Sequence, residues 1–210
     1  LEHYRFGLQT NHAVALGGSH FYLSESYSMN STIVGFGSDL SRLDVDVIHG
    51  GKNAIAKMNA IYLLKAKELF DLHTNIEHAS PNGITEENVR GIVADQSKAV
   101  FNGRIHIHRH AQKTLAELNN RNLLLSDKAE INTKPELEIY ADDVKCAHGA
   151  TIAEIDKSAL YYLQSRGIST EQAKIMLNFG FINELVDLIP NQEIAEWLRP
   201  QLRERFSQMQ

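Results

Sequence analysis

Short β-rich runs separated by small polar residues extend from residue 3 to about residue 152, and this pattern limits the possible folds more than any other feature of the chain. The runs include HFYLS (20–24), STIVGFG (31–37), LDVDVIHG (43–50) and RIHIH (104–108). Gly, Asn, Asp and Ser stand between the runs, as expected where a chain turns. The spacing is typical of an all-β architecture, which can be a sandwich, a barrel or a solenoid of stacked turns.

Two features of the corners favour the solenoid. Strong two-residue hairpin signals are absent from the sequence, and small polar corners recur, as in GGSH (17–20) and GGKN (50–53). No exact internal repeat is found, so composition alone does not choose among the three architectures. The segment NAIAKMNAIYLLKAKEL (53–69) is rich in residues of high helix propensity, and the sequence assigns it to neither helix nor strand.

The character of the sequence changes near Asp156. DKSALYYLQSRGIS (156–169) has a capping pattern and a helix end at Gly, and the next helix opens at Ser169 or Thr170 and stops before Pro190. A third helix is expected in residues 191–206, where Pro200 should kink or restart it because proline removes a backbone donor. The sequence therefore predicts a β region over 1–155 and a helical subdomain over 156–210.

The second and third helices each carry an apolar stripe. The stripe residues expected to pack inward are Ala173, Leu177, Phe181, Leu185 and Leu188, against Trp197, Leu198 and Leu202. The remaining apolar residues, Met176, Phe179 and the neighbours of Phe181, then form a small exposed patch of the kind that marks interaction sites.

Composition excludes several classes of protein. The 210 residues are 43% hydrophobic, enough to bury a core, and the formal net charge of −5 without any Lys/Arg-rich run argues against a nucleic-acid partner. No stretch is long and apolar enough for a membrane span, and one cysteine favours a reducing, cytoplasmic compartment. Because residue 1 is Leu and residues 1–9 already resemble a strand, we expect the C-terminal part of a longer chain.

That one cysteine lies in ADDVKCAHGAT (141–151). In a strand, Val144, Cys146 and His148 share one face, which places Cys146 and His148 about 6.5–7 Å apart. The distance is too long for a direct thiol–imidazole hydrogen bond, but the pair could share a soft metal or one transferred atom. Taken alone, the motif is better explained by a buried structural cysteine and a histidine bonded to the backbone.

A second histidine group, RIHIHRH, places His106, His108 and His110 on one strand face. They extend over roughly 13 Å and would converge on one metal only if the strand bent sharply, so a solvated face is the better interpretation. Asp71, His73 and Glu77 are likewise interpreted as a polar surface strand. The sequence contains no P-loop, dinucleotide-binding or G-x-S-x-G motif, and a nucleotide or serine-hydrolase site has no support.

The order of these pieces resembles a known family. AVFNGRIHIHRHAQKT (99–114), then NNRNLLLSDKAEINTKPELEIYADDVKCAHGATIAEID (119–156), then LYYLQSRGIS (160–169) with a helical tail are similar to the C-terminal half of the D-subunit branch, SufD, of the SufB/SufD family of iron–sulfur cluster assembly scaffolds. The match runs from about 99 to 181 and is looser over 1–94. The resemblance implies a mainly β fold, a right-handed parallel β-helix followed by a C-terminal helical subdomain.

The resemblance also implies a function and partners. A protein of this kind is a non-catalytic scaffold subunit that pairs with SufB and binds the SufC ATPase through its helical region. It implies no tightly bound cofactor, but a transient iron–sulfur cluster or iron shared with SufB. His148, with Cys146 in the same strand, is then expected at the cluster-assembly interface and as a metal ligand, and the ATPase is expected to dock at Phe179, Met176 and Phe181. In isolation, the exposed strand edge near Val144 is expected to form a homodimer.

Two other functions remain as alternatives. A carbohydrate-active enzyme on a β-helix would need a groove with several carboxylates and aromatics, whereas aromatic residues make up only 8% of the chain and no cluster of acids stands out. A structural solenoid without metal chemistry would work equally well without Cys146 and His148. The sequence assigns no role to His106, His108 and His110.

Overall fold

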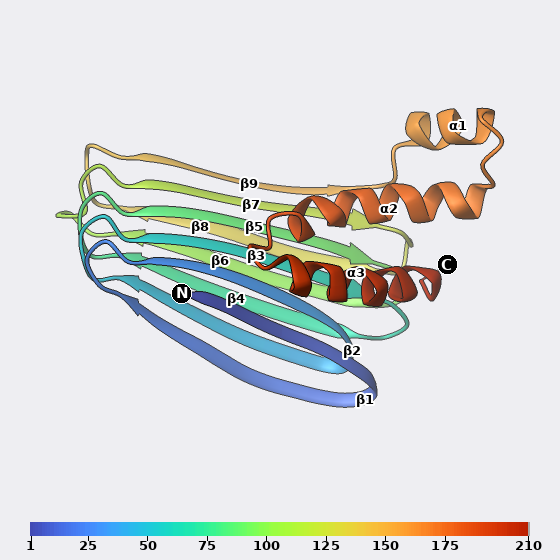
Figure 1. Cartoon of the computed structure of the whole chain (residues 1–210), viewed down its shortest axis with the longest axis horizontal. Helices are drawn as coiled ribbons and strands as arrows, with labels where there is room; N and C mark the ends of the chain where they lie inside the picture. Colours follow the sequence, from blue (N-terminus) through green and yellow to red (C-terminus); the bar gives the residue numbers. More distant parts are fainter. Residues whose placement is uncertain (210) are drawn as a thin grey trace.

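The computed structural model describes residues 1–209, and of residues 10 and 11 only their place in the first strand. These residues form a mainly β structure followed by helices (Figure 1). The strands are β1 (Glu2–Leu23), β2 (Ser28–His49), β3 (Ile55–Leu64), β4 (Leu69–His78), β5 (Ile84–Val93), β6 (Lys98–Ile107), β7 (Leu115–Leu124), β8 (Glu130–Ile139) and β9 (Lys145–Ala153). The helices are α1 (Lys157–Ser165), α2 (Thr170–Val186) and α3 (Gln192–Ser207).

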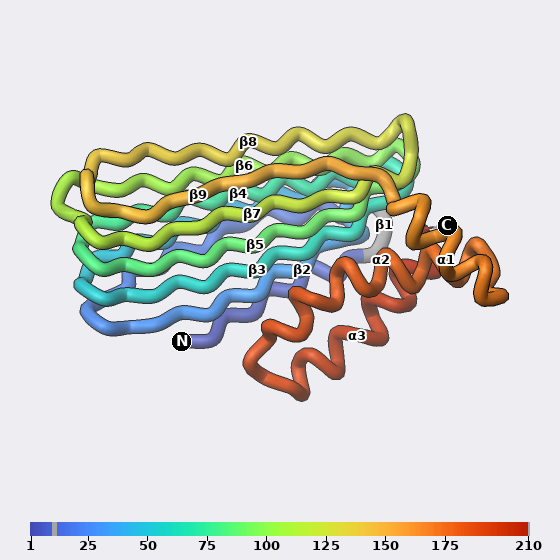
Figure 2. The backbone as a smooth tube through the Cα atoms, turned by 90° about the horizontal axis from the view of Figure 1, so that it is seen from above, coloured from blue at the N-terminus to red at the C-terminus, as the bar shows by residue number. Residues whose placement is uncertain are grey.

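The strands stack as a parallel β-solenoid of about five turns. Every pairing among the described strands is parallel, and successive turns place residues such as Ile55, Ile84, Leu115 and Lys145 side by side in register. One sheet runs β3-β5-β7-β9 and the other runs β4-β6-β8, while β2 takes part in both sheets (Figure 2). The prediction of a mainly β solenoid is confirmed, and sandwich and barrel are excluded.

The first two turns differ from the later ones because one long strand bends to serve both sheets. β2 pairs with β3 over residues 28–35 and with β4 over residues 41–49. Between these segments Gly37 adopts a φ of 88°, in the left-handed region that favours glycine. A side chain there would also collide with the backbone of Gln9 in β1. Both the backbone conformation and the lack of space therefore require glycine at position 37.

Alternation along each strand builds the interior. In β4, Phe70, Leu72, Thr74 and Ile76 are buried inside the coil while the residues between them face outward. The same alternation in β6 buries Phe101 and Ile105, and these side chains belong to one continuous apolar core that runs through the stacked turns.

The corners explain why the sequence shows no exact repeat. Successive turns place a left-handed residue at the same corner, namely Ser26, Asn53, Asn82 and Lys113. Asn82 Nδ2 donates to Asn53 Oδ1 at 3.1 Å, which links two of these corners. The corner residues differ in type and in their spacing along the chain, so the repeat is one of backbone conformation more than of sequence.

The unassigned segment 53–69 forms β3 and the corner that follows it. Its inward residues, such as Met58 and Tyr62, lie in the solenoid core, and its outward residues Ile61 and Leu63 lie beneath the helices. Because both faces are buried, the alternation that marks a strand is missing from the sequence.

Helices α2 and α3 pack on the outer face of the sheet that contains β3 and β5 (Figure 2). Their N-caps are Ser169 and Asn191, and Asp156 caps α1, as the sequence predicted for the first two helices. Helix α1 has no buried residue among those described. No described helix is long and apolar enough to cross a membrane. Separate domains at 1–155 and 156–210 stay a prediction.

Helix α3 continues through Pro200 from Gln192 to Ser207, so of the two expected effects of proline, a kink or a restart, the restart is excluded. Two expectations about the apolar stripes were wrong. Leu188 and Trp197 are each 50% exposed, not packed inward. Helix α2 ends at Val186 before Leu188, and the Trp197 ring stacks on Phe6 of β1 with centroids 5.6 Å apart. The inward stripe of α2 instead includes Ile182 and Val186, with Ile189 just beyond the helix.

Candidate functional site: the open end of the solenoid

The solenoid ends with two strands that lack an outer neighbour within residues 1–209. β8 and β9 are the last strands on the two sides of the sheet path. The residues of β9 continue the inward rows of the core, because Cys146 pairs with Ala116 and His148 with Leu118, both fully buried. Cys146 and His148 therefore share one strand face, as the sequence predicted, and that face lies over the end of the core.

Their environments differ. Cys146 is partly buried and packs against the solenoid core together with Val144. Burial raises the pKa of the Cys146 thiol, which keeps it protonated, although a contact with the Ala116 backbone opposes the shift. His148 lies further along the strand and is exposed, since no described turn covers it. The imidazole is thus the accessible group of the pair.

The free edge of β9 presents the backbone of the same two residues. Lys145 N donates to Thr114 O at 2.9 Å, so the odd-numbered residues of β9 bond to β7. In a parallel ladder the alternate residues point their N–H and C=O groups to the opposite edge. Cys146 and His148 therefore combine inward side chains with backbone groups that can pair with another strand.

The outer edge of β8 is less suited than that of β9 to pairing with an added strand. Glu130 N donates to Ser97 O at 3.0 Å, so the even-numbered residues of β8 bond to β6 and the odd-numbered ones face outward. Pro135 is one of these outward positions and has no N–H to offer. β9 contains no proline, which makes its edge the better place for an added strand.

The donor set at this end is small. Within the described part of the chain, no group of three or more His, Cys, Asp or Glu side chains is arranged to hold a metal ion. Iron–sulfur clusters generally use four protein ligands. A cluster bound at Cys146 and His148 would therefore need further ligands from a second chain.

The other predicted histidines lie elsewhere. His106 and His108 point outward, where His106 Nδ1 lies 2.7 Å from Glu138 Oε2 and His108 pairs with Glu77. Arg104 and then His106 lower the pKa of Glu138 to about 2. His110 is exposed in the corner after β6. The prediction of one strand face for all three histidines was wrong because β6 ends at Ile107, and the partners Glu138 and Glu77 come from neighbouring strands that sequence proximity does not reveal.

The same face carries the other predicted polar group. Asp71 and His73 lie on β4, with His73 Nε2 3.0 Å from Asp71 Oδ1, and Arg42 of β2 bonds to both. The structure therefore supports the interpretation of a polar surface strand.

The three residues expected to dock an ATPase have unequal exposure. Met176 is 51% exposed. Phe179 is partly buried, with its ring edge-on to Phe206 at 6.2 Å and beneath Arg203. Phe181 is also partly buried, with the Arg90 guanidinium 5.1 Å from its ring centre. The expectation that Phe179 is freely exposed was wrong, and the docking role of these residues stays a prediction.

Together, the fold and the open end define a solenoid protein whose last described turn has a free strand edge, an accessible histidine and a partly buried cysteine. A family model described as SUF system FeS cluster assembly, SufBD core domain, matches residues 1–181, and the chain belongs to this family.

Relatives from distant organisms agree with this membership. The chain is 37% identical over 156 residues to the iron–sulfur cluster assembly protein SufD of Escherichia coli, a match that covers 74% of this chain and 37% of that protein. It is 38% identical over 166 residues to a SufBD family protein of Synechocystis, covering 79% of this chain and 37% of the relative. The chloroplastic protein ABCI7 of Arabidopsis thaliana is 37% identical over 167 residues, 79% of this chain and 35% of the relative. The matched part spans little more than a third of the length of these relatives.

Proposed function

We propose that the chain is a non-catalytic scaffold subunit of the Suf iron–sulfur cluster assembly machinery. In this proposal the open end of the solenoid pairs with SufB, and a nascent cluster forms between the two subunits. The observation that carries the proposal is the combination, on one strand, of a free edge and two inward residues, Cys146 and His148, that suit soft and borderline metals. The names of the relatives support the assembly role.

The small donor set supports a shared site. A subunit with two candidate ligands at its end would bind a cluster weakly alone and release it readily, which suits a scaffold that passes its product on. Iron and sulfide are cargo in this proposal, and we expect no cofactor held by this chain alone.

Replacing His148 by Ala tests the cluster role. We expect about a tenfold loss of bound iron and acid-labile sulfide from the complex with SufB, comparable to other losses at metal sites. The melting temperature should hardly change because the side chain is exposed. Lys145→Ala is the matched control, since Lys145 is exposed on the opposite face of the same strand.

Cys146→Ser should have a smaller effect than His148→Ala, because burial keeps the thiol protonated and the thiolate is the form that binds metal. Normal cluster content, together with normal growth of cells under iron limitation, in the His148→Ala variant would show that the histidine has no such role.

Replacing Ala150 by Pro tests the free edge. The N–H of Ala150 faces away from β7 by the alternation described above, so its loss should spare the solenoid and weaken association with SufB, or with a second copy of this chain. Thr151→Pro is the contrasting variant, because it removes an N–H on the β7 side and should lower the melting temperature.

Size-exclusion chromatography with light scattering, followed by a melting curve, distinguishes the outcomes of the edge test. Undiminished association of a folded Ala150→Pro variant would place the interface elsewhere.

The SufC ATPase is proposed to dock on the helical region. Met176, Phe179 and Phe181 lie along α2 on the outside of the solenoid, and Met176 is the most accessible of the three apolar side chains. An apolar surface on a helix pair is a common site for a partner.

A further inference from the structure

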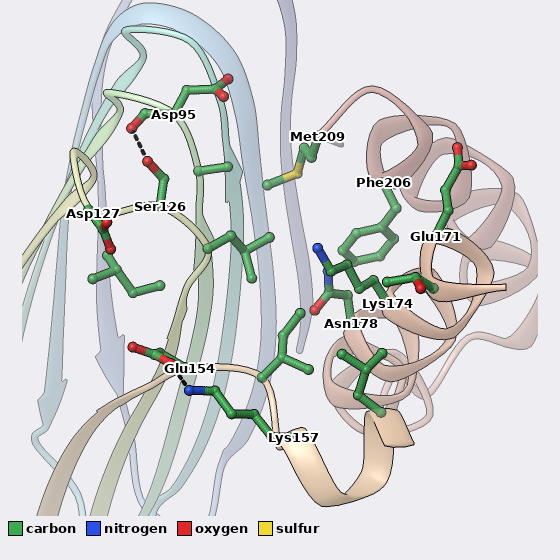
Figure 3. Close-up of a pocket in the computed structure, with 16 residues that line it drawn as sticks. Asp95, Ser126, Asp127, Glu154, Lys157, Glu171, Lys174, Asn178, Phe206 and Met209 are labelled. Atoms are coloured by element: carbon green, nitrogen blue, oxygen red, sulfur yellow. Dashed lines mark hydrogen bonds and ion pairs between the residues drawn. The ribbon is translucent and has the colours of Figure 1, made fainter. Parts of the chain in front are cut away.

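A cavity of about 660 Å³ lies between a corner of the solenoid and the start of the helical region. Figure 3 shows its two sides: Asp95, Ser126 and Asp127 on the corner face Asn178 and Phe206 on the helices. The volume falls within the roughly 300–1,000 Å³ of typical ligand pockets. The cavity lies apart from the open end, and the proposed scaffold role makes no use of it.

Asn178 is the feature that points to a ligand. It is the one polar residue among the buried positions of α2, with an exposed fraction of 7%. Its Oδ1 has no hydrogen-bond partner among the described residues, and its side chain is directed toward the cavity (Figure 3). An unpaired buried amide oxygen is costly, and a donor supplied by a ligand would remove that cost.

The cavity is also electrically unbalanced. It is lined by four carboxylates and two ammonium groups, which are Asp95, Asp127, Glu154, Glu171, Lys157 and Lys174. Glu154 and Lys157 pair with each other at 3.5 Å. Asp127 on the solenoid corner has no ion-pair partner among residues 1–209, and the unpaired Lys174 belongs to α2 on the opposite side, so the corner side of the cavity favours a cation.

Apolar side chains line the remaining surface. Leu125 and Ile155 lie on the solenoid side, with Leu160, Phe206 and Met209 on the helical side. A small hydrophilic cation would leave this apolar surface unused, whereas a leucine-sized side chain would cover it.

We propose that the cavity binds an extended peptide segment of a partner protein, in which an apolar residue stands beside a Lys or Arg. The apolar side chain packs on Leu160 and Phe206. The basic side chain faces Asp127 on the solenoid corner, and a peptide N–H donates to the amide oxygen of Asn178. A side-chain amide is complementary to a peptide group, because each carries one donor and one acceptor that can align.

Two tetrapeptides test the proposal by NMR titration of the purified chain. Acetyl-Gly-Leu-Arg-Gly-amide should bind with a dissociation constant on the order of 10⁻⁴–10⁻³ M, as expected for a short flexible ligand. Acetyl-Gly-Leu-Glu-Gly-amide should bind about tenfold more weakly because its charge opposes that of the cavity.

Asn178→Leu should lower the affinity for the arginine peptide about fivefold or more while keeping the fold, since leucine has the same branching at Cγ, suits a buried position and can extend its larger side chain into the cavity. Gln172→Leu is the matched control, being exposed on the same helix outside the cavity, and should leave the affinity unchanged.

Three results would overturn the proposal. The first is no binding of the arginine peptide up to about 5 mM. The second is equal affinity of the native chain and the Asn178→Leu variant. The third is equally tight binding of argininamide, which lacks the leucine and would identify a site for small cations.

Discussion

Replacing Arg205 by Leu is expected to lower the free energy of unfolding by about 3–5 kcal/mol. Arg205 of α3 is 4% exposed and reaches the solenoid, where its guanidinium bonds to Leu63 O at 2.9 Å and pairs with the buried Glu68. Its loss leaves the buried Glu68 carboxylate without its cationic partner and removes the guanidinium that donates to the Leu63 carbonyl. Chemical denaturation followed by circular dichroism measures the change.

The double variant Arg205→Leu/Glu68→Leu tests whether the stability lost in Arg205→Leu comes from the unpaired Glu68 charge or from lost packing of the arginine side chain. Since removing both charges avoids an uncompensated one, we expect most of the lost stability to return. Arg203→Leu is the matched control on the same helix because Arg203 is exposed, and it should change stability little. A double variant as unstable as the single one would show that Glu68 is not the source of the cost.

Replacing Glu87 by Met is expected to have the opposite sign, raising the free energy of unfolding by about 3 kcal/mol at about pH 8. Glu87 faces into the solenoid core between Met58 and Leu118, and neither of its carboxylate oxygens has a well-formed hydrogen bond to a described residue. Burial raises the pKa of Glu87 from 4.5 to about 7, and the Thr74 hydroxyl opposes the shift. The native chain therefore contains a destabilising acid that a methionine would replace with apolar contacts.

The pH dependence of this gain follows from the direction of the shift. Between about pH 4.5 and 7 the unfolded chain has released the Glu87 proton while the folded chain retains it, so native stability falls as the pH rises through this range. Above about pH 7 the loss is complete. The advantage of Glu87→Met should thus be small at about pH 4 and largest above about pH 7.

Two buried histidines make the fold less stable as the pH falls, which is the opposite pH dependence to that of Glu87. They do not affect the difference in stability between the native chain and the Glu87→Met variant. Burial lowers the pKa of His49 to about 4 and that of His78 to about 3, so both destabilise the fold as the pH falls below about 6.5. Both are present in every variant and cancel in the difference. Glu87→Gln, which keeps the size and removes the titration, is the control, and a gain for Glu87→Met that is independent of pH would show that Glu87 does not titrate in the folded chain.

The sequence predicted the strand-rich architecture and the shared strand face of Cys146 and His148 because alternation and small polar corners are local properties. It did not assign 53–69 because helices from the far end of the chain cover the outer face of β3. Leu188 and Trp197 were misplaced for a related reason: helical periodicity identifies a stripe but does not fix where the helix ends or which neighbour the stripe meets.

The residues with the largest expected effects gave no sequence signal. Glu68 and Arg205 are 137 positions apart, and their pairing depends on how α3 packs on the sheet. Glu87 lies in the polar run Thr85–Asn88 of β5, where the sequence does not show which residues point inward. Its inward direction is seen only from the residues it pairs with in the neighbouring turns. Asn178 lies in an apolar helix where a lone Asn is unremarkable until its missing partner is seen.

The way α2 and α3 cross the stack divides the molecule into parts of different cooperativity. In a solenoid each turn contacts mainly its neighbours, so order is lost most easily from an end. The helices bury Val34 of β2, Ile61 of β3 and Ile92 of β5 in one cluster, which joins the turns from β2 to β5 into a single folding unit. Strand β9 contributes nothing to that cluster among the described residues. We therefore expect the last turn to fray and re-form, and to adjust its edge to an incoming chain, more easily than the turns that the helices cover.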